Sequence, residues 1–157
     1  MTVTIRLTID DAALRRALKD PQLIAGPLKD FLAKSALTVE AEAKQVAPVD
    51  TGRLRASITS VLAPTRATVQ TAVNYAAHVE FGTRPHWPPT AAMQPWAGRH
   101  GFGVGPAGAR RLAWIISKFG TKPHPYMRPG AEAALPAIRG FLRDMAADIE
   151  RKWKGGR

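Results

Sequence analysis

The grouping of three histidines is the feature of this sequence that most suggests a metal site. His86, His100 and His124 lie in one stretch, but no two of them have the spacing of four residues that places ligands on one face of a helix. No Asp, Glu or Cys accompanies them there, whereas a closed zinc site takes four ligands and a catalytic zinc site normally takes three protein ligands. The sequence therefore predicts no metal site and no cofactor.

Polar residues give equally little support for acid/base or nucleophilic catalysis. Ser57, Asp50 and His78 are the residue types of a catalytic triad, but no Gly-x-Ser-x-Gly turn surrounds the serine. Glu80 has no second carboxylate close in sequence with which to form an acid/base pair. The glycines at 101, 103 and 105 lack the Lys-Ser/Thr ending of a phosphate-binding loop. The sequence thus predicts that the protein is not an enzyme.

Length and composition indicate one domain without covalent cross-links. The chain of 157 residues suits a single core, and it contains no cysteine. Its first ten residues lack the regions of a signal peptide, and no apolar run approaches the roughly 20 residues of a membrane span. We therefore expect a protein that is made in a reducing cytosol and has no membrane partner.

Charge is unevenly distributed along the chain, whose formal net charge is +11. No acidic residue lies between Glu80 and Glu132. The cations of that stretch are Arg84, Arg99, Arg110, Arg111, Lys118, Lys122 and Arg128. This asymmetry is informative about partners rather than about fold, and it is consistent with a solvated surface, an acidic protein neighbour or nucleic acid.

Three tryptophans accompany these cations, a combination that can bind nucleic acid through charge and stacking. The alternative is structural: Trp114 lies in an apolar helical run and is expected in the core, and Trp87 and Trp96 are expected to pack their segment onto the body. We favour the structural interpretation for the tryptophans and leave both interpretations open for the charges.

The first part of the chain reads as a strand followed by two helices. Val3 to Ile9 alternate with polar residues as in a half-buried strand, and Asp10 or Asp11 can cap a short helix that continues to Lys19. Gly26-Pro27 opens a long amphipathic helix, which stops before Pro48.

A hairpin and more helices are expected after it. The strands run from 57 to 62 and from 67 to 73, joined by a turn at Pro64-Thr65. Helices are expected at 74–81, 90–99 and 107–119, and Pro129 starts the last one, which Pro136 should kink or delay. Strands and helices segregate, which predicts an α+β fold: a small antiparallel β-sheet packed against a long central helix and a C-terminal helix, with a helical insertion.

The insertion is bounded by two matching segments. Gly82-Thr83-Arg84-Pro85-His86 recurs as Gly120-Thr121-Lys122-Pro123-His124, and we interpret the two copies as stiff ends of a Pro- and Gly-rich helical segment at about 84–122. Residues 1–157 are expected to form one domain that carries this segment. We expect the segment to contact a neighbouring subunit or DNA.

Three motifs combine residues with special backbone requirements and apolar anchors. They are Ala47-Pro48-Val49-Asp50-Thr51-Gly52-Arg53-Leu54-Arg55-Ala56-Ser57-Ile58, Tyr75-Ala76-Ala77-His78-Val79-Glu80-Phe81-Gly82-Thr83 and Pro125-Tyr126-Met127-Arg128-Pro129. In the first, Asp50 can cap the turn while Gly52 takes a positive φ. In the third, Pro125 to Pro129 fixes where the last helix begins.

The order of these motifs, from about Leu28 to Trp153, resembles the tail-completion or head–tail joining proteins of long-tailed bacteriophages. The motif residues that carry the resemblance are Asp50, Thr51, Gly52, Leu54, Tyr75, Glu80, Phe81, Gly82, Pro125, Arg128 and Pro129. The candidates for contact with other subunits or with DNA are Arg84, Trp87, Trp96, Arg99, Arg110, Arg111, Lys118 and Lys122. The long insertion between Gly82 and Pro125 departs from many relatives, which look shorter.

The resemblance implies a structural virion protein that forms a ring, expected to be six-fold, at the head–tail junction or the tail end. Its partners would be other copies of itself, the neighbouring neck or connector proteins, and tail tube or tail terminator proteins, with genomic DNA a candidate in the lumen. It would be synthesised in the cytoplasm of the bacterial host. The alternatives are a basic nucleic-acid-binding module without enzymatic activity, suggested by charge alone, and a small hydrolase, suggested only by scattered His and Ser.

Overall fold

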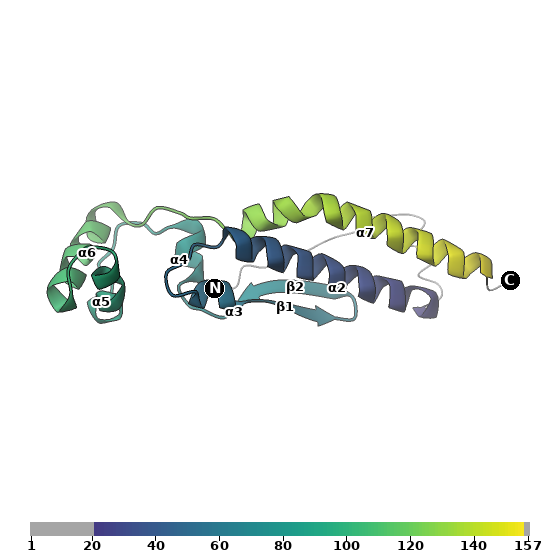
Figure 1. Ribbon diagram of the computed structural model, residues 1–157, viewed down its shortest axis with the longest axis horizontal. Coiled ribbons are helices and arrows are strands. Elements are labelled where there is room, and N and C mark those ends of the chain that lie inside the picture. Colours follow the sequence, from purple (N-terminus) through teal and green to yellow (C-terminus); the bar gives the residue numbers. More distant parts are fainter. Residues whose placement is uncertain (1–20, 156–157) are drawn as a thin grey trace. The chain divides into compact units, whose positions relative to one another are not determined.

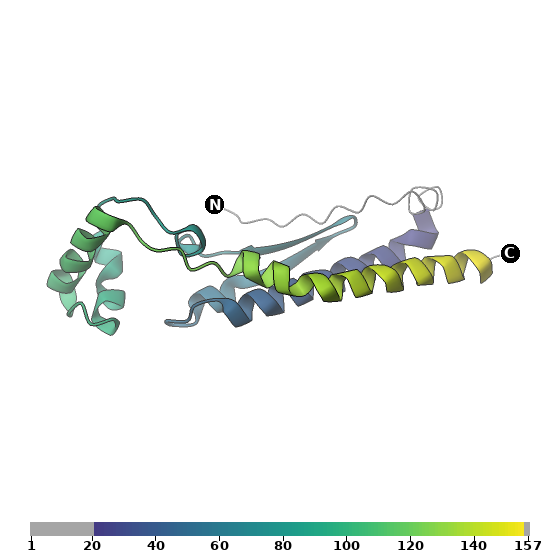
Figure 2. The same ribbon diagram turned by 90° about the horizontal axis from the view of Figure 1, so that it is seen from above.

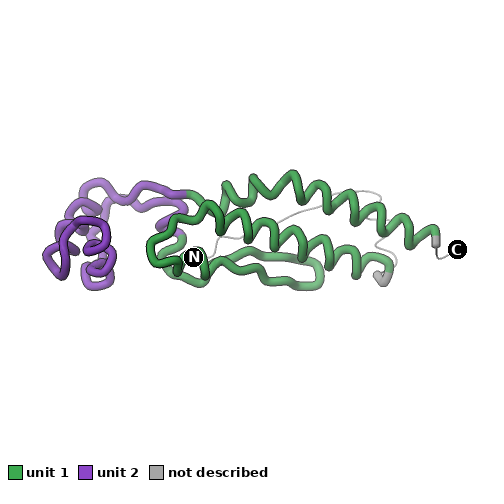
Figure 3. Tube along the Cα trace, in the orientation of Figure 1, with its two compact units in different colours: residues 1–76, 125–157 green, residues 77–124 purple. Residues whose placement is uncertain are grey.

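A computed structural model describes residues 21–155 of the chain. The chain divides into two compact units, residues 1–76 together with 125–157, and residues 77–124 (Figure 3). The strand predicted from Val3 to Ile9 and the helix predicted up to Lys19 lie outside the described residues.

The first unit is organised around one long helix. This helix, α2 (Pro21–Val46), contacts both strands of a β-hairpin and also α7 (Met127–Gly155), which runs alongside it in the opposite direction (Figures 1 and 2). The hairpin pairs β1 (Ile58–Ala63) with antiparallel β2 (Arg66–Thr71), and a short helix, α3 (Arg53–Ser57), precedes it. The predicted α+β fold is thereby confirmed: the small antiparallel sheet packs against α2, and the C-terminal helix α7 packs against the same helix.

Burial along α2 follows the predicted helical period. Its buried apolar residues include Phe31, Leu32, Ala36, Val39 and Ala43. The hairpin contributes Ile58 and Val69 to the core, and α7 contributes Ala134, Ile138, Met145 and Ile149. Because α2 has neighbours on two sides, its apolar face is wider than a single stripe, as expected for a helix between two layers.

Two small residues bring α2 and α7 close together. A Cβ atom at Gly130 would lie 2.5 Å from both the backbone nitrogen and the Cα of Ala43. These are backbone atoms, which cannot rotate away as the end of a side chain could. Gly130 therefore allows the two helix backbones to come together at this point, and any side chain at position 130 would push them apart.

A hydrogen-bonded carboxylate joins α2 to the hairpin. Glu40 on α2 accepts a hydrogen bond of 2.6 Å from Lys44 Nζ and is also bonded by the side chain and backbone of Ser60 on β1. Partial burial raises the pKa of the Glu40 carboxyl group, but the Lys44 and Ser60 hydrogen bonds and the Lys44 charge together lower it below its ordinary value. The ionised form of Glu40 thus favours the packing of β1 on α2.

Several predicted boundaries and faces differ from the structure. The long helix begins at Pro21 instead of Gly26-Pro27, and Pro27 is buried inside it, so its packing compensates for the missing N–H donor. The last helix begins at Met127 and continues through Pro136, where Ala134 and Ile138 on either side are buried.

Three large apolar residues of the two long helices are substantially exposed: Val46 of α2, and Leu135 and Trp153 of α7. The helix α3 was not predicted, because five residues are too few to show a helical period.

The second unit begins within α4 (Ala76–Phe81), at Ala77, and contains α5 (Thr90–Arg99) and α6 (Gly105–Phe119). The last two pack together around Ala97, Leu112 and Ile116, with Met93 and Phe102 partly buried beside them. The limits of α5 are those predicted, and α6 begins two residues earlier than predicted. No helix of the described chain is both long and apolar enough to span a bilayer.

Replacing Gly130 tests the close approach of the helices, because Gly140 on the same helix provides a matched control. Gly140→Ala meets no atom within 4 Å and should be neutral or stabilising by up to about 1 kcal/mol, since alanine favours helix over glycine. Gly130→Ala should lower the free energy of unfolding by about 1–3 kcal/mol, because the added methyl group overpacks the contact with Ala43. Chemical denaturation of both variants measures this difference, and equal stability of the two would contradict it.

Candidate functional site

The turn that follows α2 has the backbone conformation predicted for it. Gly52 adopts φ 78° and caps the N-terminus of α3, and its carbonyl oxygen accepts a 2.9 Å hydrogen bond from the Ala56 N–H. Leu54 is buried and anchors the turn, while Asp50 and Thr51 are exposed. The predicted positive φ at Gly52 is confirmed, and it reverses the chain between α2 and the hairpin.

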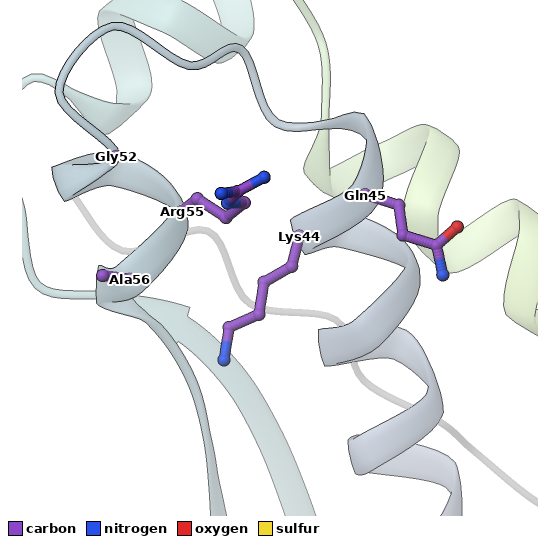
Figure 4. Close-up of a pocket in the computed structure, with 5 residues that line it drawn as sticks. All are labelled: Lys44, Gln45, Gly52, Arg55 and Ala56. Carbon is purple, nitrogen blue, oxygen red and sulfur yellow. The ribbon is translucent and has the colours of Figure 1, made fainter.

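A shallow hollow lies beside this turn. It is lined by Lys44, Gln45, Gly52, Arg55 and Ala56, and Figure 4 shows the Lys44 and Arg55 side chains in the space between α2 and α3. These five residues include two cations but no hydroxyl, thiol or carboxylate group. Ser57, one member of the triad considered above, donates a 2.7 Å hydrogen bond to the Leu54 carbonyl and contacts Thr71 Oγ1 at 2.6 Å, so its hydroxyl holds α3 against β2.

The second motif forms α4 and its ends. Glu80 is buried with 3 % of its surface exposed, whereas Phe81 is 63 % exposed and Tyr75 is exposed at 36 %. Gly82 ends the helix with φ 68°, as expected for a glycine at this position. The motif therefore places one carboxylate inside the fold and an aromatic side chain outside it.

The two matching segments are paired with each other. Thr83 and Thr121 form an antiparallel bridge, with hydrogen bonds from Thr83 N–H to the Thr121 oxygen at 3.1 Å and from Thr121 N–H to the Thr83 oxygen at 3.2 Å. Their Oγ1 atoms also lie 3.1 Å apart. We call this pairing of residues 82–86 with 120–124 the clasp.

Glycine is required on both sides of the clasp. Gly82 and Gly120 each have φ 68°, and a Cβ atom at either position would clash with the carbonyl oxygen of the threonine on the opposite segment. The His124 N–H also donates a 2.7 Å hydrogen bond to the Val79 oxygen, which ties the end of the segment to α4. The clasp thus fixes the two ends of the helical segment next to each other.

The third motif begins α7 and is largely buried. Tyr126 and Met127 are completely buried, while Arg128 points outward and donates a 2.8 Å hydrogen bond to Glu132, which raises the pKa of the Arg128 guanidinium. Pro129 is partly buried and Pro125 is exposed. The two buried residues were not among the predicted site residues, although their position between Pro125 and Pro129 signals a fixed junction.

The tryptophans of the second unit are more exposed than predicted. Trp114, expected in the core, is 55 % exposed, because Leu112, Ala113 and Ile116 occupy the side of α6 that packs on α5. Trp87 is 59 % exposed. Trp96 stacks on His100 with ring centroids 4.0 Å apart and on Phe102 at 5.8 Å, so it packs within its own unit.

The predicted contact cations of the second unit all reach the surface. Arg84, Arg99, Arg110, Arg111, Lys118 and Lys122 are exposed. Three of them, at positions 110, 111 and 118, share one face of α6 with Trp114. The structure therefore brings half of the predicted cations together on one helix, while the others lie at the clasp or at the end of α5.

The histidines are dispersed over different local environments. His86 Nδ1 lies 2.9 Å from the Arg84 carbonyl oxygen, His100 stacks on Trp96, and His124 follows the clasp threonine by three residues. Among residues 21–155 no group of three His, Cys, Asp or Glu side chains could hold a metal ion.

Substitutions at Gly52 test whether its positive φ is required. Gly52→Val should lower the free energy of unfolding by about 1–3 kcal/mol, because a β-branched residue is strained at this φ although the space around it is open. Gly52→Asn should cost less, since asparagine tolerates the left-handed region. Thermal denaturation compares the two, and a valine variant as stable as the wild type would contradict the mechanism.

The clasp is tested by three glycine-to-alanine variants with different surroundings. Gly101 has φ 78°, and a Cβ atom added there would have no neighbouring atom within 4 Å. Gly101→Ala should therefore lower the free energy of unfolding by about 1–2 kcal/mol because of the backbone strain alone. Gly82→Ala and Gly120→Ala should lower the free energy of unfolding by at least about 1 kcal/mol more than Gly101→Ala does, because the added methyl group also overpacks the bridge. Hydrogen exchange of the Thr83 and Thr121 amides measures the difference. Equal protection in all three variants would show that the clasp does not depend on close backbone contact.

Comparison with known proteins identifies one family. Residues 11–82 match the family model described as "Bacteriophage HK97-gp10, putative tail-component". The match includes α2, the Gly52 turn, the hairpin and α4, and it ends at the first residue of the clasp. No curated protein and no solved structure gives a significant match. The resemblance to phage tail proteins is therefore confirmed: over residues 11–82 the chain matches a family of bacteriophage tail components.

Proposed function

We propose that the protein is a structural, non-enzymatic virion subunit that assembles into a closed ring at the head–tail junction or at the end of the tail. The family match supports a tail-related role, and the order of the three motifs supports the more specific one. In this proposal the ring completes the tail and joins it to the head, in contact with neck or connector proteins on one side and tail tube or terminator proteins on the other.

The observation that carries the ring proposal is the exposure of large apolar side chains on the first unit. Val61 and Leu62 of β1 are 50 % and 47 % exposed, and Leu135 and Trp153 of α7 are 41 % and 52 % exposed. Large apolar side chains that are exposed on one subunit can be buried against another copy. They lie on two different elements, as a ring requires, because a head-to-tail interface joins two unlike surfaces of one subunit.

The rigidity of the first unit is consistent with this role. The Gly52 turn fixes how the hairpin leaves α2, and the Ala43–Gly130 approach fixes α7 against the same helix. Surfaces held in this way meet a neighbour without a large loss of conformational freedom, so more of the contact energy is available for assembly. The six-fold symmetry that we propose comes from the resemblance to tail proteins.

A pair of hairpin variants tests the ring. The double variant Val61→Asp/Leu62→Asp should stay folded by circular dichroism but should lose the ring, because two charges enter an apolar interface. The control Thr59→Asp/Thr65→Asp places the same two charges on exposed residues of the same hairpin and should assemble. Assembly is measured by native mass spectrometry of the purified chain and by symmetry-resolved imaging of particles.

Two results would overturn the proposal. One is a particle in which single copies are scattered rather than arranged in a ring. The other is assembly of the Val61→Asp/Leu62→Asp variant at the wild-type level, which would place the interface elsewhere and remove the observation that carries the proposal.

A further inference from the structure

The outer face of α6 is composed of cations around an exposed aromatic ring. Arg110, Arg111, Trp114 and Lys118 follow one another at intervals of one, three and four residues, which places them on one side of a helix. All four are exposed, and the opposite side, with Leu112 and Ile116, packs against α5. The apolar side of this amphipathic helix is therefore occupied, and the cationic side faces solvent.

No carboxylate in the second unit is placed to neutralise this face. The only acidic residue from 77 to 124 is Glu80, which is 3 % exposed and lies on α4. No salt bridge of Arg110, Arg111 or Lys118 occurs among the described residues. By contrast, the cations of α7 at 128, 151, 152 and 154 all have a carboxylate partner three or four residues away.

We propose that this face of α6 binds the phosphate backbone of duplex DNA. An α-helix is about 10–12 Å across with its side chains and so fits the major groove, which is about 12 Å wide. Along the helix axis, Arg110 to Lys118 span about 12 Å. Three cations along that length meet a surface that carries one negative charge per roughly 1.7 Å of its axis. Trp114 at the centre provides an apolar contact for sugars or base edges.

An acidic protein is the less suitable partner for the same face. Three cations buried against a protein would each need a matched carboxylate. A nucleic acid supplies evenly spaced charges without such matching. The DNA contact does not depend on the ring, because all four residues belong to one helix of one subunit.

The test compares two triple variants of the full chain by fluorescence anisotropy with a labelled duplex of about 30 base pairs over a range of salt concentrations. Arg110→Gln/Arg111→Gln/Lys118→Gln removes the charges of the face. Arg66→Gln/Arg139→Gln/Arg143→Gln removes the same number of exposed charges from the first unit and serves as the control. Both variants have equal net charge, so a difference between them reports the position of the charges.

The α6 variant should bind the duplex at least about tenfold more weakly than the wild type does. The slope of log K against log salt should become shallower by about 2.7, or about 0.9 for each phosphate that the variant no longer neutralises. The control should stay close to the wild type. Equal weakening of both variants, or no binding by the wild-type chain, would overturn the proposal.

Two further probes separate the remaining partners. A single-stranded oligonucleotide that binds more tightly than the duplex, and loses this advantage in Trp114→Ala, would reassign the face to single strands through base stacking. A labelled polyglutamate peptide of equal charge that binds as tightly as the duplex would reassign it to an acidic protein. Either result would overturn the assignment to duplex DNA.

Discussion

The first unit depends on the close approach of Ala43 and Gly130. Protein interiors are close-packed, so a gap of even one methyl group along the α2–α7 interface would weaken the packing over its whole length. Because α2 also supports the hairpin, a shift of α7 would be transmitted to the sheet through the same helix. The buried residues Tyr126 and Met127 just before this point then fix where α7 begins.

Local sequence rules predicted the architecture well where the spacing of apolar residues or a special backbone conformation determined it. The hairpin, its Pro64-Thr65 turn, the end of α2 before Pro48 and the positive φ of Gly52 all follow from side-chain alternation or from proline and glycine stereochemistry. Pro27, which lies inside α2 and not at its start, was misjudged for a related reason. The absence of one hydrogen bond stops a helix only when tertiary packing does not compensate for it, and packing is not visible in a local window.

The candidate site was predicted in part. The three motifs and the basic segment were singled out from the sequence, and the two matching Gly-Thr-x-Pro-His segments were interpreted as the ends of an insertion. Their mutual pairing could not be predicted, because Thr83 and Thr121 are 38 residues apart and neither lies in a strand with a recognisable period. Trp114 was placed in the core because its neighbours are apolar, although its position around the helix is opposite to the buried side.

The clasp also has a consequence for how the chain tolerates change. Once the ends of a segment are held together, the entropy of closing the loop grows only with the logarithm of its length, by about 0.6 kcal/mol for each doubling. Residues between Arg84 and Lys122 could therefore be lengthened, shortened or replaced at little thermodynamic cost to the rest of the chain, provided that both clasp segments remain. In this sense the clasp makes the helical segment an exchangeable module, in which a surface such as the outer face of α6 can diverge while the packing around Ala43 and Gly130 stays constant.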